Sequence, residues 1–555
     1  MNNLTPLAIA LLAASQSAFA QQPPNAGEQL RQIPPPVMND KASPDIRVER
    51  QATPDRTETG GATVRVKRVK VTGNTRFSEG DLIAAANIVP DRDLTLADLR
   101  AAAARISAFY NSRGFFLASA YLPAQDVSDG AVEIAVVEGR YGKIDVRNQA
   151  GLADGRARQV LSGLDSGDLV ANGPLERRLL LLSDIPGVRV RSTLSPGSAV
   201  GTSDLVVDID RGRRVTGSVE ADNAGNRYTG TYRVGGTINL NNPTGLGDLV
   251  SLRVLASEGG LAYGRASYQA PVGDATLGVA FTHLQYELGR EFRVLEGKGT
   301  ADILSVFGSY PLIRSRSANL YALAGVDAKS LEDKVGLVST KSDRRLGVAN
   351  LGLGGDWRDG IAGGGANLFS AGVAVGEVDI RSPAERAADA LTARSDGGFG
   401  KVQGSFSRLQ SLGGPLSLYG SVRGQLAFDN LDSSEKIQLG GAYGVRAYPE
   451  GEAYGDHGYV ATLEARLLLN RRDQGLPGQF QLIGFVDAGE VQFAQDRWFP
   501  GSNHAALSGV GAGLTWFGPY DFIVRGSYAR KLSDAKSTSQ PDKDGRAWFQ
   551  IAKLF

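Results

Sequence analysis

The stretch Leu416-Ser417-Leu418-Tyr419-Gly420-Ser421-Val422-Arg423-Gly424-Gln425-Leu426 alternates between two kinds of side chain. Leucine, valine and glycine occupy every second position, and polar residues or tyrosine occupy the positions between them. Successive side chains of a β-strand point to opposite faces, so such a strand has one face suited to lipid and one suited to a watery lumen. Residues 459–467 repeat the pattern, with Thr462, Glu464 and Arg466 on one face. The alternation predicts strands of a transmembrane β-barrel.

Sixteen segments of this kind follow one another through the C-terminal part of the sequence. They are Val215–Ala221, Tyr228–Leu240, Leu249–Ala256, Leu261–Ala270, Ala275–Tyr286, Ala301–Tyr310, Ala318–Ala328, Leu346–Trp357, Ala366–Val378, Gly400–Leu409, Leu416–Phe428, Tyr459–Leu469, Phe480–Phe493, Ser508–Phe517, Phe522–Leu532 and Arg546–Phe555. An even number of strands is typical of bacterial outer-membrane barrels. We therefore predict a C-terminal 16-stranded antiparallel transmembrane β-barrel over residues 214–555.

The connections between the predicted strands alternate in length. The tight ones are residues 242–245, 271–274, 413–415 and 518–521, and the long ones include 289–299, 379–398, 494–507 and 533–545. Outer-membrane barrels have short periplasmic turns and longer external loops, so we place the tight turns and everything before the first strand in the periplasm. A soluble β-sandwich would alternate too. A last strand that ends in Phe555 resembles the assembly signal of outer-membrane proteins and favours the barrel.

The composition excludes several classes of site. The 555 residues include no cysteine and carry a net charge of +1. Disulfide scaffolds, cysteine zinc sites and thiol nucleophiles are thereby excluded, and the chain has no overall attraction to nucleic acid. A short apolar run ends at Ala18-Phe19-Ala20, which predicts a secretory signal peptide at residues 1–20. No later uncharged run reaches about 18 residues, so we expect no transmembrane helix.

Residues 21–62 form an N-terminal segment rich in proline, which is typical of a linker. Within it, Asn25–Gln32 could make two helical turns before Pro34 stops the helix. A helix this short is marginal in water, so we expect it to dock in a groove.

Helical and strand periods alternate between this segment and the barrel. Residues 63–139 have the order β-α-α-β-β, with elements at Val64–Val71, Ser78–Ala86, Asp98–Tyr110, Phe115–Leu122 and Val132–Val137. Residues 140–213 repeat the order, with elements at Gly142–Val146, Gly155–Leu164, Pro174–Leu182, Val188–Leu194 and Asp204–Asp210. Two tandem copies of one unit form an internal repeat and predict two small α+β domains.

Both units contain stretches that resemble a known kind of domain. Three stretches of the first unit resemble a POTRA domain, namely Tyr110-Asn111-Ser112-Arg113-Gly114-Phe115, Leu122-Pro123-Ala124-Gln125-Asp126 and Val137-Glu138-Gly139. Residues 175–187, LERRLLLLSDIPG, resemble the second POTRA domain of two-partner-secretion transporters, the TpsB family of haemolysin activation/secretion proteins. The resemblance implies two periplasmic POTRA domains that capture a partner protein. We assign partner binding in the first of them to Tyr110, Arg113, Gly114, Phe115 and Gln125.

A Gly- and Pro-rich stretch lies in a long loop at residues 429–458. Its Val445-Arg446-Ala447-Tyr448 resembles the Val-Arg-Gly-Tyr signature on the sixth external loop of the same family and of the wider outer-membrane assembly superfamily, with alanine in the third position. Phe485-Val486-Asp487-Ala488-Gly489 resembles the facing strand motif. The resemblance implies that the loop folds into the barrel and that Arg446 meets Asp487 there.

We predict that this pair locks the loop and gates the lumen, supported by Gly444, Val445, Tyr448 and Gly489. An Arg-carboxylate pair is strong and directional, and partial burial raises the cost of breaking it. Two alternatives stay open: an exposed Arg446 without a partner, and an ion pair that pins the loop without gating.

The resemblance also implies a function. A TpsB transporter exports one large exoprotein across the bacterial outer membrane, and its POTRA domains capture the N-terminal TPS domain of that exoprotein while it is unfolded. Exposed sheet edges make strand addition the expected mode of capture. The short helix at residues 25–32 resembles the plug helix of the family. Outer-membrane lipid and, during biogenesis, the barrel-assembly machinery are the other expected partners. We expect no nucleic acid, cofactor or metal, and the sequence contains no P-loop motif for a nucleotide.

Two other functions were weighed. An insertase that assembles other barrels shares the loop signature, but usually carries more POTRA domains. An outer-membrane hydrolase would need a catalytic cluster, whereas the sequence has no G-x-S-x-G motif and has three histidines, His283, His457 and His504. We therefore predict that the protein is not an enzyme and has no catalytic residues.

Overall fold

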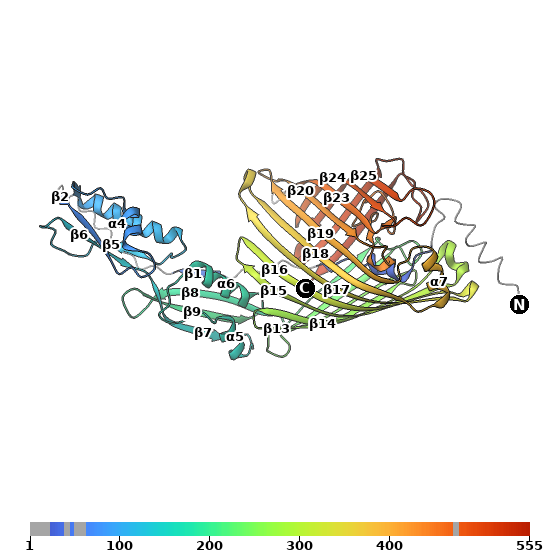
Figure 1. Ribbon diagram of the computed structural model, residues 1–555, viewed down its shortest axis with the longest axis horizontal. Helices are drawn as coiled ribbons and strands as arrows, with labels where there is room; N and C mark the ends of the chain where they lie inside the picture. Colours follow the sequence, from blue (N-terminus) through green and yellow to red (C-terminus); the bar gives the residue numbers. More distant parts are fainter. Residues whose placement is uncertain (1–22, 38–44, 49–62, 470–476) are drawn as a thin grey trace.

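A computed structural model describes residues 23–37, 45–48, 63–469 and 477–555. Two α+β domains and a large barrel follow one another along the long axis of the molecule (Figure 1). The predicted signal peptide at residues 1–20 lies outside the described residues. Within these ranges, the structure contains no helix with the length and apolarity to cross a membrane.

The barrel is closed and antiparallel over the part of the chain that the structure describes. Each strand pairs with the next, and the last pairs with the first. The strands are β10 (Val215–Asp222), β11 (Arg233–Asn241), β12 (Leu249–Ser257), β13 (Ala262–Val272), β14 (Ala275–Glu287), β15 (Gly297–Arg314), β16 (Ala318–Val335), β17 (Thr340–Asp359), β18 (Gly365–Ile380), β19 (Gly397–Ser411), β20 (Leu416–Ala427), β23 (His457–Leu469), β24 (Gln479–Gln492), β25 (His504–Phe517), β26 (Phe522–Lys531) and β27 (Gly545–Leu554). The predicted 16-stranded barrel is confirmed.

The outer face of the barrel is apolar, as the alternation predicts. On β14, Leu277 and Phe281 are each 51% exposed, whereas the intervening Ala280 and Leu284 are buried. In water, a continuous exposed apolar surface of this kind would be unstable, but hydrocarbon solvates it. The exposed apolar side chains therefore face lipid, and the soluble sandwich is excluded.

Three neighbouring strands extend beyond their predicted bounds. β15, β16 and β17 contain 18, 18 and 20 residues. At their external ends, Lys298, Lys334 and Lys341 lie opposite one another on adjacent strands. These charged side chains interrupt the apolar alternation, although the backbone hydrogen bonds continue. Alternation therefore marks the part of each strand that lies in lipid and misses the part that extends into water.

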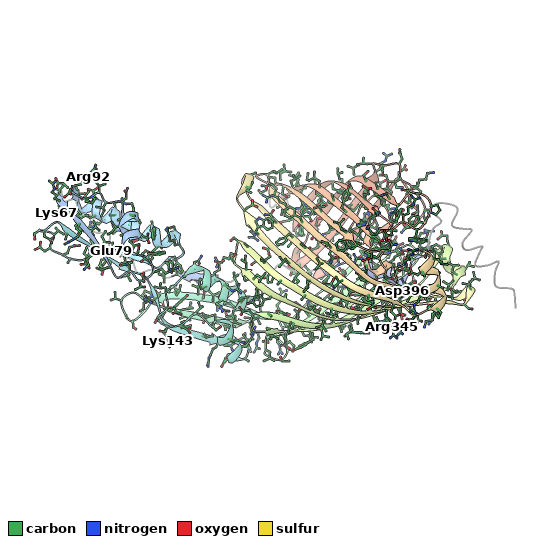
Figure 2. All side chains as sticks on the ribbon, viewed as in Figure 1. Lys67, Glu79, Arg92, Lys143, Arg345 and Asp396 are labelled. Carbon is green, nitrogen blue, oxygen red and sulfur yellow. The ribbon has the colours of Figure 1, made fainter. Side chains whose placement is uncertain are left out.

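The two ends of the barrel carry different connections. The end away from the α+β domains carries η2 (Arg290–Leu295), η3 (Gly336–Val338), α7 (Pro383–Leu391) and the long loop between β20 and β23. Arg345 and Asp396 mark this end in Figure 2. The opposite end has shorter connections, including η4 (Ile361–Gly363) and η7 (Pro519–Asp521). The long loops are thus on the predicted external side.

The first α+β domain packs two helices on short strands. Its elements are β2 (Thr63–Val66), β3 (Arg68–Thr72), α3 (Glu79–Ala86), β4 (Arg92–Thr95), α4 (Leu96–Ser112), β5 (Ser119–Tyr121) and β6 (Ala131–Val137). Strands β3, β6 and β5 form one sheet, and β2 pairs with β4. Leu82, Ile106 and Ile134 lie in the fully buried core between helices and sheet.

The predicted strand at residues 64–71 is in fact two strands. The backbone N–H groups of Lys67 and Arg68 both donate to the carbonyl of Gly130, so the chain bends between β2 and β3. The predicted strand at 115–122 is shortened to β5, because the chain after Gly114 turns back with a hydrogen bond from Phe115 N–H to Tyr110 O. The four-residue β4 was not predicted, since it is too short to show a period.

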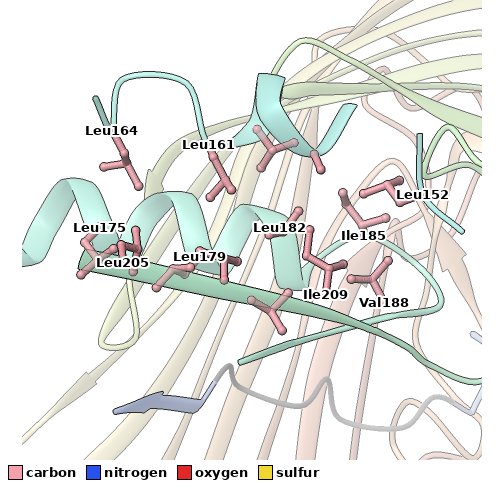
Figure 3. Packing of buried hydrophobic residues seen from close by; sticks show 14 of the residues in the cluster. Leu152, Leu161, Leu164, Leu175, Leu179, Leu182, Ile185, Val188, Leu205 and Ile209 are labelled. Atoms are coloured by element: carbon pink, nitrogen blue, oxygen red, sulfur yellow. The ribbon is translucent and has the colours of Figure 1, made fainter. Parts of the chain in front are cut away.

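The second α+β domain is built on a leucine-rich helix. Its elements are β7 (Arg140–Asn148), α5 (Asp154–Val160), α6 (Asn172–Ser183), β8 (Val188–Pro196) and β9 (Thr202–Arg211). Figure 3 shows Leu175, Leu179 and Leu182 of α6 above Leu205 and Ile209 of β9. The spacing of four and three residues places the leucines on one face of the helix, which is why α6 packs flat on the sheet.

A strand from the N-terminal segment extends this sheet. β1 (Asp45–Val48) pairs in parallel with residues 191–194 of β8, so the sheet order is β1-β8-β9-β7. The segment was predicted as linker, because four residues give no readable alternation. The unpaired backbone groups at the edge of β8 supply the hydrogen bonds that order β1.

Candidate functional site inside the barrel

The loop between β20 and β23 folds into the barrel. It contains η5 (Ser433–Glu435) and a two-stranded pairing of β21 (Ile437–Gln438) with β22 (Tyr454–Gly455). Val445, Ala447 and Tyr448 of this loop are fully buried. Burial of apolar side chains is what holds a loop of this length inside the lumen instead of in the external solvent.

Arg446 and Asp487 form a bidentate ion pair at the tip of the loop. Arg446 Nη2 lies 2.7 Å from Asp487 Oδ1, and Arg446 Nε lies 2.8 Å from Asp487 Oδ2. The backbone N–H of Arg446 also donates to Oδ2, at 3.1 Å. Asp487 is fully buried, and the Arg446 side chain is 15% exposed. The alternative of an exposed arginine without a partner does not describe this structure.

Side chains of the wall strands β23 and β24 also contact the guanidinium of Arg446 and the carboxylate of Asp487. Arg446 Nη1 donates to Glu464 Oε1 at 2.9 Å, and the Thr462 hydroxyl donates to Asp487 Oδ1 at 2.9 Å. The ring of Phe485 lies under the guanidinium, with its centroid 3.4 Å from Cζ. The alternation had placed Thr462 and Glu464 on the lumen face, but no signal in the sequence paired them with the loop.

Small residues permit the loop to approach the wall closely. A Cβ atom at Gly489 would lie 2.5 Å from Tyr459 O of the wall. Within the loop itself, a Cβ atom at Gly444 would lie 2.2 Å from Leu439 O, so this glycine lets the loop fold tightly on itself. The methyl group of Ala447, which replaces the family glycine, lies where a Cβ on Gly509 would be only 2.5 Å away. Gly509 on β25 therefore makes the room that the extra methyl group needs.

Tyr448 joins the tip of the loop to a second external loop. Its hydroxyl lies 2.9 Å from Ser533 Oγ and 3.1 Å from Ala535 O, and the Lys531 ammonium lies over its ring. The neighbouring Val445 is fully buried among the apolar residues that surround it. These contacts explain why a tyrosine and a branched apolar residue flank Arg446.

The helix α2 (Ala26–Arg31) lies inside the barrel, between β14, β15 and β16 and η5 of the loop (Figure 1). Asn25 caps its N-terminus, and the buried Gln29 accepts a hydrogen bond of 2.7 Å from Thr229. At its C-terminal end, Arg233 Nη1 donates to Gln32 O at 3.0 Å. A cation at the C-terminal end of a helix complements the helix dipole. The docking groove expected for the short helix is thus the lumen itself.

The base of the loop is held by a second group of charges that sequence reasoning missed. Asp432 accepts from Arg344 Nη1 at 2.6 Å, and Glu435 forms ion pairs with Lys329 and Lys401. The cations come from β17, β16 and β19, far from the Arg446 site around the barrel. In the sequence each of these cations is one of several charged residues on its strand, and its lumen-facing register was the one signal available.

The predicted partner-binding residues of the first domain have different surroundings. Tyr110 is fully buried, and its hydroxyl donates to Glu138 at 2.9 Å. Arg113 is exposed, and its guanidinium stacks 3.5 Å from the centre of the Phe109 ring. Phe115 is half-buried beside these rings. Arg113 and Phe115 are therefore accessible to a partner, whereas Tyr110 supports the core.

The other two predicted residues shape the same domain. The Gln125 side chain forms the two hydrogen bonds that a neighbouring strand would form with Glu133. It donates to Glu133 O at 2.7 Å and accepts from Glu133 N–H at 2.6 Å. Gly114 has a φ of 91°, which favours glycine, and its carbonyl accepts from Asn172 N–H of the second domain. Gly114 thus lies at the junction of the two domains.

Glu138 is expected to make the first domain sensitive to acid. Burial alone would raise the pKa of this carboxyl, but hydrogen bonds from Thr75, Arg76 and Tyr110 outweigh burial and lower it. A pKa below the unfolded value of about 4.3 contributes stability above that pH, and the contribution is lost as pH falls through the folded pKa. Thermal unfolding of the periplasmic domains should therefore shift to lower temperature between pH 5 and pH 3. In Glu138→Gln the shift should be smaller and stability at pH 7 about 2 kcal/mol lower; an unchanged pH profile in this variant would contradict the assignment.

All four charged residues of the stretch 175–187 contact the barrel. Asp184 and Arg314 form a bidentate pair with distances of 2.7 and 2.9 Å. Asp274 accepts from Arg178 at 3.1 Å, Arg177 Nη2 donates to a barrel carbonyl, and Glu176 accepts from a barrel N–H. The leucines between them form the core of the domain. One sequence motif therefore builds the second domain and docks it on the periplasmic turns of the barrel.

Asp184→Ala is expected to loosen this docking. The change leaves Arg314 without its carboxylate, and a charge-assisted bidentate pair is among the stronger contacts of an interface. Because the chain contains no cysteine, spin labels can be attached at Lys143→Cys in the domain and Tyr520→Cys on the barrel rim. The distance distribution between them should broaden in Asp184→Ala. It should stay narrow in Asp210→Ala, which removes an ion pair with Arg191 inside the domain; equal distributions in both variants would refute the docking role.

The structure does not assemble a hydrolytic centre around the histidines. His457 Nδ1 accepts from Ala427 N–H at 3.2 Å, while the adjacent Asp456 pairs with Lys436 at 2.7 Å. His283 and His504 pair with carboxylates at the exposed surface. In the part of the chain that is described, no cluster of three His, Asp or Glu side chains could hold a metal ion.

Comparisons with known proteins agree with this architecture. The family described as "Haemolysin secretion/activation protein ShlB/FhaC/HecB" matches residues 201–516, and "POTRA domain, ShlB-type" matches residues 64–139. The heme/hemopexin transporter protein HuxB of Haemophilus influenzae strain 86-028NP is 28% identical over 472 residues, which cover 84% of this chain and 82% of HuxB. The outer membrane transporter CdiB of Dickeya dadantii strain 3937 is 26% identical over 428 residues, which cover 74% and 72% of the two chains.

Solved structures share the fold. CdiB from Escherichia coli has a TM-score of 0.72 at 21% identity, over 91% of this chain and 93% of that chain. CdiB from Acinetobacter baumannii has a TM-score of 0.64 at 20% identity, over 99% and 97%. The family match at residues 201–516 spans more than half of the sequence and includes both Arg446 and Asp487. The chain therefore belongs to the haemolysin secretion/activation protein family ShlB/FhaC/HecB, a family of outer-membrane two-partner-secretion transporters with POTRA domains and a β-barrel.

Proposed function

We propose that this protein recognises the N-terminal secretion domain of one large exoprotein in the periplasm and moves the unfolded chain through its barrel to the cell surface. No nucleotide drives the step; folding of the exoprotein outside the cell draws the chain outward. In this proposal the Arg446–Asp487 pair holds the loop in a position that transport requires. The proposal extends the family assignment to a mechanism.

The observation that carries this proposal is the filled lumen. A barrel of this size has an aqueous interior, and an open one would leak ions and metabolites. Here an inward-folded loop and the helix α2 occupy that interior together, and polar and charged contacts hold both to the wall. A passive pore has no need of such a closure, whereas a channel that opens for a polypeptide does.

The part of the lumen that remains open suits a passing chain of varied sequence. A cavity of about 660 Å³ is lined largely by uncharged residues, among them Gln269, Thr276, Ser305, Asn350, Ser370 and Gln403; its charged lining residues are Arg31, Arg265, Asp327 and Arg423. The uncharged polar groups form hydrogen bonds with a polypeptide backbone without favouring any one side chain. Weak binding along the path supports both entry and exit.

We expect capture by strand addition as the first step, and the open sheet edges of the two α+β domains are the candidate places for it. The outer edge of β8 is already covered by β1. At the edge of the first-domain sheet, β5 pairs with β6 on one side alone and carries the half-exposed Tyr121. We therefore place the first contact of the exoprotein at β5, close to the accessible Arg113 and Phe115.

Co-expression with an exoprotein that carries an N-terminal TPS domain tests the function. The exoprotein should reach the cell surface or the medium when the chain is present and stay in the periplasm when it is absent. Purified protein in liposomes should move the exoprotein across the bilayer without added nucleotide. If other outer-membrane barrels disappear when the chain is removed while export is unaffected, the insertase alternative holds instead.

A further inference from the structure

One carboxylate of the barrel wall binds both the helix α2 and the base of the loop. Asp333 Oδ1 accepts from the backbone N–H of Ala26 at 2.8 Å and from the Tyr286 hydroxyl at 2.6 Å. Its other oxygen, Oδ2, accepts from Arg344 Nη2 at 2.7 Å. The opposite nitrogen of the same guanidinium, Nη1, donates to Asp432 Oδ2 at 2.6 Å. The connection runs without a gap from α2 through Asp333 and Arg344 to Asp432 of the loop.

Each step of this connection is shielded from water. The side chains of Asp333, Arg344 and Asp432 are 15%, 11% and 2% exposed. Hydrogen bonds between charged groups are stronger in such surroundings than at a surface, and a partner left unpaired there is costly. Loss of one contact therefore weakens the next one along the connection.

The loop residues at the end of this connection also contact the start of the helix α2. Asp432 Oδ1 accepts from Ser434 N–H at 2.8 Å and so fixes the turn η5. The hydroxyl of Ser433 in that turn donates at 2.8 Å to the side chain of Asn25, the residue that caps α2. The helix start, the wall pair and the loop base thus form a closed ring of contacts.

We propose that Asp333 and Arg344 are positioning residues that couple release of the plug helix α2 to release of the loop. The inference rests on the proposed function, in which both must move for the exoprotein to pass. Coupling between two sites is reciprocal, so displacement of α2 loosens the loop base and loosening of the loop base weakens the hold on α2. A force on either α2 or the loop therefore loosens both segments and makes the lumen easier to open.

The same wall supplies a matched control. Lys329 lies on β16, four residues before Asp333 and on the same face, and pairs with Glu435 of the same loop turn. Among the described residues, the contacts of Lys329 end at the loop and include no hydrogen bond to α2. Arg344→Gln and Lys329→Gln each remove one wall-to-loop ion pair, and of the two residues Arg344 alone continues to the helix through Asp333. In Lys329→Gln, Glu435 keeps its second cation, Lys401.

Two cysteine reporters separate the movements of helix and loop. The natural chain has no cysteine, and Gln29 of α2 and Ser434 of the loop are each nearly fully buried. Gln29→Cys then reacts with a maleimide when the helix leaves its place, and Ser434→Cys when the loop base opens. Both are measured on the full chain in detergent or liposomes, with heat-modifiability as the test of a folded barrel.

Arg344→Gln is expected to speed labelling at both reporters by about tenfold, within the usual range of coupling between sites. Lys329→Gln should speed labelling at position 434 and have a clearly smaller effect at position 29, because the contacts of Asp333 with Ala26 and Arg344 stay in place. Adding Asp333→Asn to Arg344→Gln should give little further increase in the labelling rate, because both changes break the same connection.

Three results would each overturn the proposal: faster labelling of the loop alone in Arg344→Gln, equal effects of Arg344→Gln and Lys329→Gln at position 29, or no change in labelling at either position. Labelling needs no exoprotein, so a failure of export with the expected labelling would count against the proposed function alone.

Discussion

Arg446→Ala is expected to abolish export of the exoprotein while the barrel stays folded in the outer membrane. Asp487 is fully buried and accepts three hydrogen bonds from Arg446. Breaking a buried pair by removing one partner costs about 3 kcal/mol or more, because the other charge stays behind uncompensated. A loss of 3 kcal/mol shifts the balance between the locked and unlocked loop by about 100-fold. Exoprotein in the medium, compared with exoprotein retained in the periplasm, is the measurement.

The ion pair between Arg408 and Asp359 is the matched control. It is also bidentate, with Arg408 Nη1 and Nη2 at 2.7 and 2.9 Å from the two oxygens of Asp359, but it joins β19 to the end of β17 away from the loop. Arg408→Ala should therefore leave export near normal. Asp487→Ala should behave like Arg446→Ala, and the exchange of the two charges should restore part of the export. Normal export in both single variants would mean that the pair pins the loop without any role in transport.

Gly27→Val is expected to displace the helix α2 and open the lumen to ions. A Cβ atom at Gly27 would lie 2.4 Å from Ser433 Oγ and 2.6 Å from the backbone nitrogen of Ser434. The serine side chain can rotate away, but the backbone of η5 is held by Asp432 and cannot. Overpacking of this kind costs about 1–3 kcal/mol, which corresponds to a change of about 5- to 150-fold in the population of the open lumen. Ionic current through the purified protein in planar bilayers is the measurement.

Gly155→Val is the control for replacing a helical glycine by valine. Gly155 also lies in a helix, α5 of the second domain, and a Cβ there would meet no atom within 4 Å. The control should conduct like the natural protein, because valine has a higher helix propensity than glycine and the new side chain meets no neighbour at this position. Equal currents in the two variants would show that α2 does not close the lumen.

Much of the barrel follows from the local sequence. The face on which a strand residue lies depends on its position in a two-residue period, so Val422 and Leu426 could be assigned to lipid and Gln425 to the lumen before any pairing was known. The structure agrees, since Val422 and Leu426 are exposed and Gln425 is buried. The same reasoning fails beyond the lipid, where Lys298 and Lys334 continue strands without the apolar signal.

The Arg446 site was accessible from sequence for a different reason. Arg446 in a Gly- and Pro-rich loop and a lone aspartate, Asp487, in an alternating strand are each unusual, and the family resemblance joined them. The other residues of the site have no unusual sequence context of this kind. Glu464, Asp333 and Arg344 look like ordinary lumen residues in the sequence, and the β1 strand is four residues in a proline-rich segment.

The sequence by itself determined the order of the parts, the number of barrel strands and the side of each strand that faces lipid. These properties depend on residues close together in the chain, where the period of the backbone sets the direction of every side chain. The tertiary structure alone decided which charges meet: Asp432 with Arg344, Asp184 with Arg314, and the start of α2 with Asp333. The partners are 88, 130 and 307 residues apart. The first and third pairs form because closure of the barrel brings distant strands, the loop and α2 to one lumen, and the second forms because the second α+β domain docks on the periplasmic turns. No local pattern encodes either event.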